Sequence, residues 1–119
     1  MYFFDSYAII EVLKRSPSYA KYANENIVLT ILNLIEVTQY FLEHYGESKA
    51  KEVCESLRTA VMEVNNSHIL NAVKFRSENK KKSLSYADCL GYIYSKQEGM
   101  LFLTGDHAFE RLPNVEFVK

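Results

Sequence analysis

Short apolar segments with strand character alternate with longer segments of helical periodicity along the whole chain. The strand-like segments are Tyr2–Phe4, "VMEVN" at 61–65, Leu101–Leu103 and Val115–Val118. Apolar residues at helical spacing fill the stretches between them. This alternation is typical of α/β proteins, in which crossover helices connect the strands of a mainly parallel sheet. We therefore expect an α/β fold built on a mainly parallel sheet.

The helical patterns are predicted at 7–15, 27–45, 47–61, 67–79, 85–99 and, as a short helix, 107–112. The pattern at 27–45 is the longest, and Gly46 supplies a natural end for it. Its broad apolar stripe is expected to face the core and consists of Ile31, Leu34, Ile35, Thr38, Phe41, Leu42 and Tyr45. No repeat or linker divides the chain, so residues 1–119 are predicted to form one domain.

Composition limits the class of protein further. The chain has 119 residues, of which 48% are hydrophobic and 24% charged, as in soluble globular proteins. The net charge of -1 creates no field that attracts nucleic acid, so any such binding must use a local patch. Cys54 and Cys89 form neither a disulfide framework nor a Cys-x-x-Cys pair, which suits a reducing compartment. With no signal peptide and no membrane-spanning segment in the sequence, we expect a cytoplasmic protein.

Four acids occupy places that packing alone does not explain. Asp5 and Asp106 each follow the C-terminal end of a strand, whereas Glu36 and Asp88 interrupt apolar helices. Each also has a structural interpretation. Asp5 and Asp106 suit helix N-caps, Asp88 follows Ser85 at the spacing of a capping box, and Glu36 can reach water from a helix edge.

Taken together, the four acids predict a metal site. In a parallel sheet, the strand C-termini and the starts of the following helices share one edge, where ligands bind. Carboxylates gathered there repel one another unless a cation neutralises them. A set of oxygen ligands suits a hard cation such as Mg²⁺ or Mn²⁺, and metal-bound water can attack a phosphodiester.

The chain also resembles a known family. The segments "YFFDSYAII", "LTILNLIEV", "LSYADCLGY" and "LFLTGDHAFERL…VEFV" are similar, in this order, to the PIN domain (PilT N-terminus), especially the small toxin ribonucleases of VapBC toxin–antitoxin pairs. The resemblance implies a five-stranded parallel sheet between helices, as a three-layer sandwich. It also implies a Mg²⁺- or Mn²⁺-dependent endoribonuclease acting on single-stranded RNA. By position, the family's catalytic and metal-binding acids correspond to Asp5, Glu36, Asp88 and Asp106, and its supporting hydroxyl residues to Ser6 and Thr104.

Two positions depart from the family pattern. Tyr7 stands where many members carry a small residue, so we expect a bulkier rim around the site. Ala108 stands where many members carry a further acid, which leaves four acids without a spare. The missing acid is the main feature that favours the alternative function, a non-catalytic PIN-like module that binds RNA or protein.

Partners are indicated only by residue type. Basic residues that could hold RNA phosphates, or simply lie in solvent, are Lys14, Arg15, Lys80, Lys81 and Lys82. The chain has nine tyrosines and no tryptophan. Tyrosines could supply the face of a homodimer or a concave groove for an antitoxin, or they could fill the core; the six concerned are Tyr19, Tyr22, Tyr40, Tyr45, Tyr92 and Tyr94.

Overall fold

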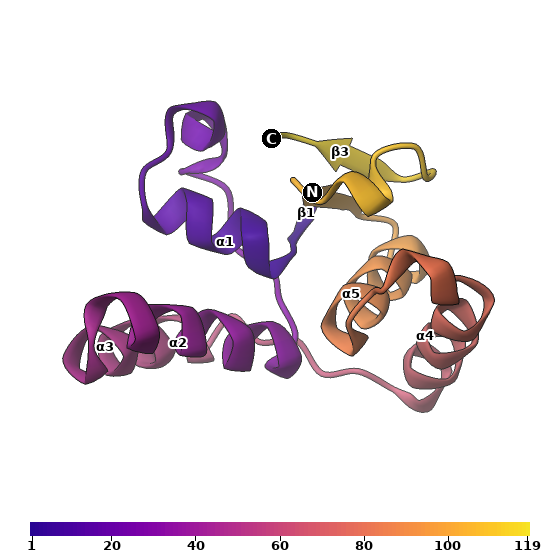
Figure 1. Cartoon of the computed structure of the whole chain (residues 1–119), viewed down its shortest axis with the longest axis horizontal. Coiled ribbons are helices and arrows are strands. Elements are labelled where there is room, and N and C mark those ends of the chain that lie inside the picture. Colours follow the sequence, from indigo (N-terminus) through magenta and orange to yellow (C-terminus); the bar gives the residue numbers. More distant parts are fainter.

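A computed structural model describes all residues from 1 to 119. Its elements follow one another as β1 (Tyr2–Phe4), α1 (Ser6–Leu13), the 3-10 helix η1 (Pro17–Tyr22), α2 (Ile31–Tyr45), α3 (Glu47–Arg58), α4 (Asn66–Glu78), η2 (Lys80–Lys82), α5 (Tyr86–Gln97), β2 (Leu101–Thr104), η3 (His107–Phe109) and β3 (Val115–Phe117). The predicted α/β class is confirmed (Figure 1).

The sheet is parallel throughout, in the order β1-β2-β3. Beside β1, the chain around Leu29 runs as a fourth segment, because the Phe4 amide donates to the Val28 carbonyl at 3.0 Å. A fifth segment is reduced to one parallel bridge between Leu29 and Val61, with the Met62 amide bonded to the Leu29 carbonyl at 2.8 Å. The predicted strand at 61–65 therefore pairs at a single point, because the chain has already turned by Asn65 to cap α4.

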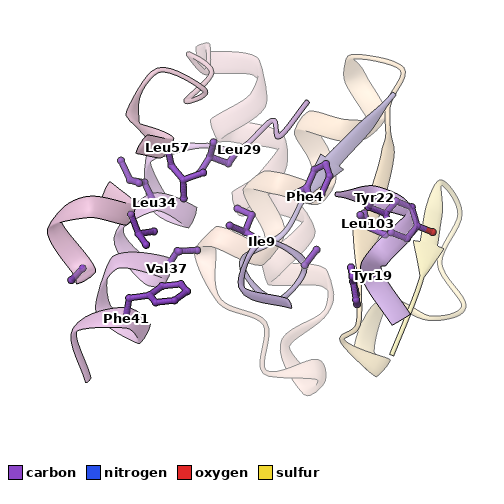
Figure 2. Packing of buried hydrophobic residues seen from close by; sticks show 13 residues of the cluster. Phe4, Ile9, Tyr19, Tyr22, Leu29, Leu34, Val37, Phe41, Leu57 and Leu103 are labelled. Atoms are coloured by element: carbon purple, nitrogen blue, oxygen red, sulfur yellow. The ribbon is translucent and has the colours of Figure 1, made fainter. Parts of the chain in front are cut away.

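Helices cover the sheet in two groups that meet its opposite faces. Successive strand residues point to opposite faces, so Phe4 packs toward α1, α2 and α3 whereas Phe3 packs toward α4 and α5. Figure 2 shows the first of these clusters, in which Phe4 and Leu103 of the strands lie near Ile9 of α1. Strands buried on both faces explain the uninterrupted apolar runs in the sequence.

Helix α2 begins four residues later than predicted. The amide and hydroxyl groups of Thr30 both donate to Asn33 Oδ1, at 2.9 and 3.0 Å, and this side-chain contact defines the start of the helix. The predicted inward stripe is wrong in part. Leu34 and Phe41 are buried, but four of its members are 42% to 59% exposed, namely Ile31, Ile35, Leu42 and Tyr45.

Most of the tyrosines fill the core instead of forming a partner surface. Tyr19, Tyr22, Tyr92 and Tyr94 are buried, Tyr40 is half-buried and only Tyr45 of the six is exposed. The hydroxyls of three buried tyrosines attach the C-terminal segment to the helices. Those of Tyr19 and Tyr22 donate to the Val118 carbonyl and to Glu116, and that of Tyr92 donates to the Pro113 carbonyl at 2.9 Å.

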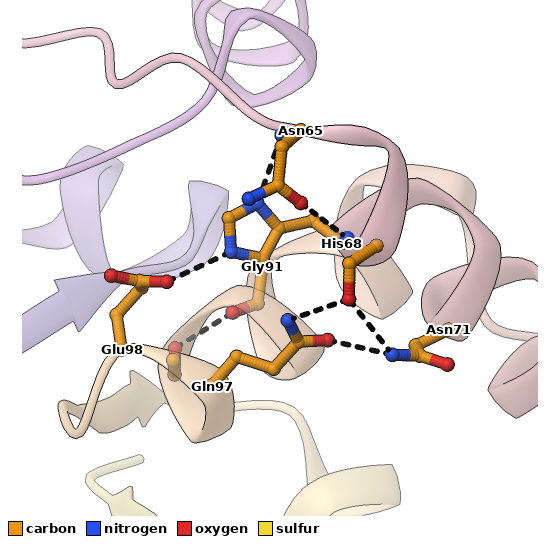
Figure 3. Close-up of polar contacts among 8 residues, drawn as sticks. Asn65, His68, Asn71, Gly91, Gln97 and Glu98 are labelled. Carbon is orange, nitrogen blue, oxygen red and sulfur yellow. Dashed lines mark hydrogen bonds and ion pairs between the residues drawn. The ribbon is translucent and has the colours of Figure 1, made fainter.

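Helices α4 and α5 are joined by the buried imidazole of His68 (Figure 3). Its Nδ1 accepts the amide hydrogen of Asn65 at 3.0 Å, so the neutral ring carries its hydrogen on Nε2. Nε2 lies 3.0 Å from Glu98 Oε2, just beyond the end of α5. One side chain therefore caps α4 and holds it against α5.

A close approach between α5 and the sheet occurs at Gly91. A Cβ atom at this position would lie 2.6 Å from Cε1 of Phe3 and 3.2 Å from Cε1 of Phe102. Both rings are fully buried, so neither has free space to move into. The helix can lie this close to the strands only because residue 91 has no side chain.

We predict that Gly91→Ala destabilises the protein by about 1–3 kcal/mol, the usual cost of overpacking a core. Chemical denaturation measures the change in the free energy of unfolding. In a Phe3→Leu background the ring is gone, and the same alanine should cost clearly less. An equal cost in both backgrounds would contradict the assigned contact.

Candidate active site

Two aspartates lie at the C-terminal edge of the sheet and are connected through Thr104. Asp5 directly follows β1 and is 3% exposed. Its Oδ1 accepts the Ala8 amide at 2.7 Å, and its Oδ2 accepts the Thr104 hydroxyl at 2.5 Å. The Thr104 oxygen in turn accepts the amide of Asp106 at 3.0 Å. The two strand tips are thus held in one hydrogen-bonded chain.

Glu36 joins the same edge through Ser6. The Ser6 hydroxyl donates to Glu36 Oε1 at 2.5 Å, and it accepts from the Asn33 amide at 3.1 Å. Asn33 is 1% exposed and was not predicted as part of this site. The signal for it was present, because Thr30 and Asn33 are three residues apart within an apolar run, close to capping-box spacing.

Asp88 approaches from the first turn of α5. Its Oδ2 accepts the Ser85 amide at 2.9 Å, and its own amide donates to the Ser85 hydroxyl at 3.0 Å. Together these contacts form the capping box that the Ser85–Asp88 spacing predicts. The side chain is half-buried, whereas a typical surface cap is fully exposed.

Three of the acids, Asp5, Asp88 and Asp106, lie close enough for their charges to interact. The pKa of Asp5 is raised to about 7, mainly by burial and also by the charges of Asp88 and Asp106, while the hydrogen bonds from Thr104 and Ala8 oppose the rise. The pKa of Asp88 is raised by desolvation and by the charge of Asp106, against the bonds from Ser85. Asp5 and Asp88 therefore keep their protons to a higher pH than an ordinary aspartate does, unless a nearby cation stabilises the charged form.

The structural interpretation of the acids is also correct, and it leaves oxygens free. Asp5 caps α1, Asp88 caps α5 and Asp106 caps η3, where its Oδ1 accepts the Ala108 amide at 2.9 Å. For Asp88, Asp106 and Glu36, these bonds use one carboxylate oxygen each, and the other oxygen has no protein partner and is not buried. Capping and ligand binding are therefore compatible.

The acids are not already gathered into a group of ligands. No set of three or more histidine, cysteine, aspartate or glutamate side chains lies in a position to hold one metal ion. The side chains of the four acids, which the sequence predicts as a metal site, therefore do not form a ready-made set of ligands. Like charges favour separation, and each acid is drawn aside by its own hydrogen bond. By chemistry, the set of carboxylate oxygens fits a hard divalent cation.

Tyr7 forms the rim of this edge, as its size predicts. Its ring lies against Gly105, where a Cβ atom would come within 2.2 Å of the ring carbon Cε1. The ammonium of Lys119 lies 5.0 Å from the centre of the same ring. Gly105 therefore provides the space that the tyrosine occupies beside Asp106.

The predicted basic residues separate into two groups. Lys82, from η2, donates to the Ala108 carbonyl at 2.9 Å and so lies beside the acids, and Lys80 and Lys81 are exposed next to it. Lys14 instead pairs with Glu11 at 3.6 Å and lies over the Tyr40 ring. Arg15 is exposed at the end of α1, in a left-handed conformation.

Comparison with known proteins gives a family and a fold. The PIN domain profile matches residues 2–115, and comparison with curated protein sequences found no matching relative. The chain is similar to a chain of a toxin–antitoxin complex from Klebsiella pneumoniae, with a TM-score of 0.73, 18% identity and coverage of 98% of this chain and 96% of that one. No helix has the length and apolar character needed to cross a bilayer.

Two further solved structures share the fold. VapBC-1 from nontypeable Haemophilus influenzae matches with a TM-score of 0.69 and 17% identity, over 98% of this chain and 95% of that one. VapBC2 from Rickettsia felis, bound to a DNA fragment from their promoter, matches with a TM-score of 0.68 and 16% identity, over 99% and 98%. Since the family profile spans nearly the entire chain, this protein belongs to the PIN domain family.

Proposed function

We propose that this protein is a Mg²⁺- or Mn²⁺-dependent endoribonuclease that cleaves single-stranded RNA. The observation that carries the proposal is the proximity of Asp5, Asp88 and Asp106, which are close enough that repulsion, together with burial, raises the pKa of Asp5 and Asp88. Membership of the PIN domain family supports nuclease chemistry at that edge. Helix capping alone does not require several carboxylates to lie close together, because one side chain caps each helix.

We assign the metal to Asp5, Glu36, Asp88 and Asp106. When bound, a divalent cation supplies a Lewis acid and a water of lowered pKa that can attack the phosphodiester. Two hydroxyl groups of the chain hold the carboxylates in position. Thr104 holds Asp5, and Ser6 holds Glu36 by one of its carboxylate oxygens. Each hydroxyl orients a carboxylate without adding charge.

The alternative is a PIN-like module that binds RNA or protein without cleaving it. Ala108 supports this alternative, because it occupies the position where many family members carry a further acid. The Ala108 amide is instead used to cap η3 through Asp106. RNA binding without cleavage in Mn²⁺ would decide in favour of the module.

The cellular role that we propose is that of a toxin held inactive by an antitoxin. The structural likeness to chains of VapBC and related toxin–antitoxin complexes supports this role.

We further propose that the protein forms a homodimer through an apolar groove of about 340 Å³ between α2, α4 and the start of α5. Every lining side chain is hydrophobic, including Leu32, Ile69 and Val73. Ile35, one turn after Leu32 on α2, and Leu70, next to Ile69 on α4, are 59% and 61% exposed. A surface with both a groove and projecting aliphatic side chains is self-complementary, as a two-fold interface requires.

The first test of this function replaces Asp88 with Asn, which keeps the shape and the capping ability. Removing one repelling charge should leave the metal-free variant at least as stable as the wild type. It should lose the stabilisation by Mn²⁺, about 2.7 kcal/mol at a hundredfold excess over the dissociation constant. RNA cleavage should fall by more than about 100-fold.

Thermal melts with chelator and with Mn²⁺, together with cleavage of labelled single-stranded RNA, measure these effects. Glu78→Gln, on the exposed end of α4, is the matched control and should behave as the wild type. Equal shifts in melting temperature for wild type and Asp88→Asn on adding Mn²⁺ would contradict the assignment of Asp88.

The raised pKa of Asp5 predicts how stability depends on pH. In the folded protein this pKa is about 7, against 3.8 for an unperturbed aspartate, so between these values the folded state holds the extra proton. The stabilising effect of the protonated group is complete below pH 3.8 and is lost as pH rises through 7. Metal-free protein should therefore lose stability over this window, at a rate approaching about 1.4 kcal/mol per pH unit.

Urea denaturation in chelator from acid to neutral pH measures this slope. Asp5→Asn cannot ionise, so the decline should be smaller by this amount in the variant. An unchanged slope in Asp5→Asn would show that another group causes the decline.

The homodimer is tested by Val73→Asp, which places a charge on the wall of the groove. Val73 is 45% exposed in a single chain, so the variant should fold normally. Sedimentation should show a dimer for the wild type and a monomer for the variant. The control Leu42→Asp, at an exposed aliphatic position elsewhere on α2, should stay dimeric. A monomeric wild type would rule out the homodimer.

A further inference from the structure

Two lysines from distant parts of the chain hold the turn that carries Asp106. Lys119, after β3, donates to the Gly105 carbonyl at 3.3 Å, and Lys82, in η2, donates to the Ala108 carbonyl at 2.9 Å. Asp106 therefore lies between two carbonyls, each of which accepts from an ammonium group. Of the two, only Lys82 is indicated by the sequence as a candidate for binding phosphate, because it belongs to the basic run at 80–82.

Neither ammonium is neutralised by a carboxylate. The ion pairs formed by lysines elsewhere join Lys14 to Glu11, Lys21 to Glu116 and Lys49 to Glu52. Lys82 and Lys119 have no acidic partner within 4.0 Å, although they lie beside the turn that carries Asp106. An ammonium has three donors, and one carbonyl uses a single donor. Both groups thus keep donors and a full charge for an anion.

Lys119 is also fixed in place by the aromatic rim. Its ammonium lies over the Tyr7 ring, which is held between Gly105 and Tyr19. The Tyr7 hydroxyl has no partner in the protein and is not buried. A cation held over an aromatic face loses little further freedom when it binds a ligand.

From this arrangement we infer that Lys82 and Lys119 bind the two phosphates on either side of the phosphate to be cleaved, which itself lies at Asp106. The carbonyls that they hold are three residues apart, so at most about 11 Å of chain separates them. Each strand of duplex DNA carries one charge about every 3.4 Å along the helix axis, and by this measure the span covers a few consecutive phosphates.

This inference rests on the proposed nuclease function and names how its substrate is held. The contact is to backbone phosphate, so it positions the strand and carries no sequence preference. Lys82 and Lys119 are positioning residues. The metal and the acids remain the catalytic groups.

The test measures binding of a short labelled single-stranded RNA by fluorescence anisotropy, in chelator so that no cleavage occurs. Affinity is followed from about 50 to 200 mM salt, where each phosphate contact contributes about 0.7 to the log–log slope. Lys82→Gln and Lys119→Gln keep a donor for the carbonyl but lose the charge. Each should reduce the slope by about 0.7, and the double variant by about 1.4.

Lys51→Gln is the matched control, because Lys51 is an exposed lysine on α3 without an ion-pair partner. Its slope should equal that of the wild type, and Lys82→Arg and Lys119→Arg should restore the slope. The weakening should be the same for RNAs of different sequence.

Three results would overturn the inference. The first is an unchanged slope in both glutamine variants. The second is a decrease in slope no larger than that of Lys51→Gln, and the third is the absence of RNA binding by the wild type at low salt. A purely structural role would lower the melting temperature without changing the slope. The nuclease proposal is judged separately, by cleavage in Mn²⁺ by the wild type, so either proposal can fail while the other stands.

Discussion

Burial of the Asp5 carboxylate is the constraint on which the rest of the site depends. A carboxylate with almost no exposure is costly unless its oxygens are hydrogen-bonded, and both oxygens here are. The two bonds come from α1 and from β2, so one side chain fixes the first helix and the central strand relative to each other. Because desolvation is only partly compensated, the group keeps a raised pKa and remains receptive to a cation.

Each of the other acids is also held by a hydrogen bond to the protein, but through one oxygen only. Asp88 and Asp106 each fasten the first turn of a helix with one oxygen and keep the second oxygen free. Glu36 is fastened by Ser6 in the same way. A structural bond to one oxygen limits the rotation of the side chain, which leaves the other oxygen already oriented toward a restricted region. The bonds that cap the helices are thus compatible with the ligand role that we propose for the free oxygens.

The fold class and the placement of the acids at strand tips and helix starts could be predicted from local patterns. The period of apolar residues showed that α2 exists, but its first turn depended on the Thr30–Asn33 contact, which periodicity does not detect. The exposure of Ile35 and the pairing of Val61 at one point depend on neighbours that are distant in sequence. Lys119 is the clearest case, because only the position of β3 brings it to Gly105.

The contact between Tyr7 and Gly105 has a consequence for how this sequence can change over time. The ring occupies the space that any side chain at position 105 would need. A lineage that acquires a larger residue at 105 must therefore first lose the aromatic ring at position 7, and with it the surface on which Lys119 rests. These three positions are expected to vary together, so a rim of this kind is inherited or lost as a unit.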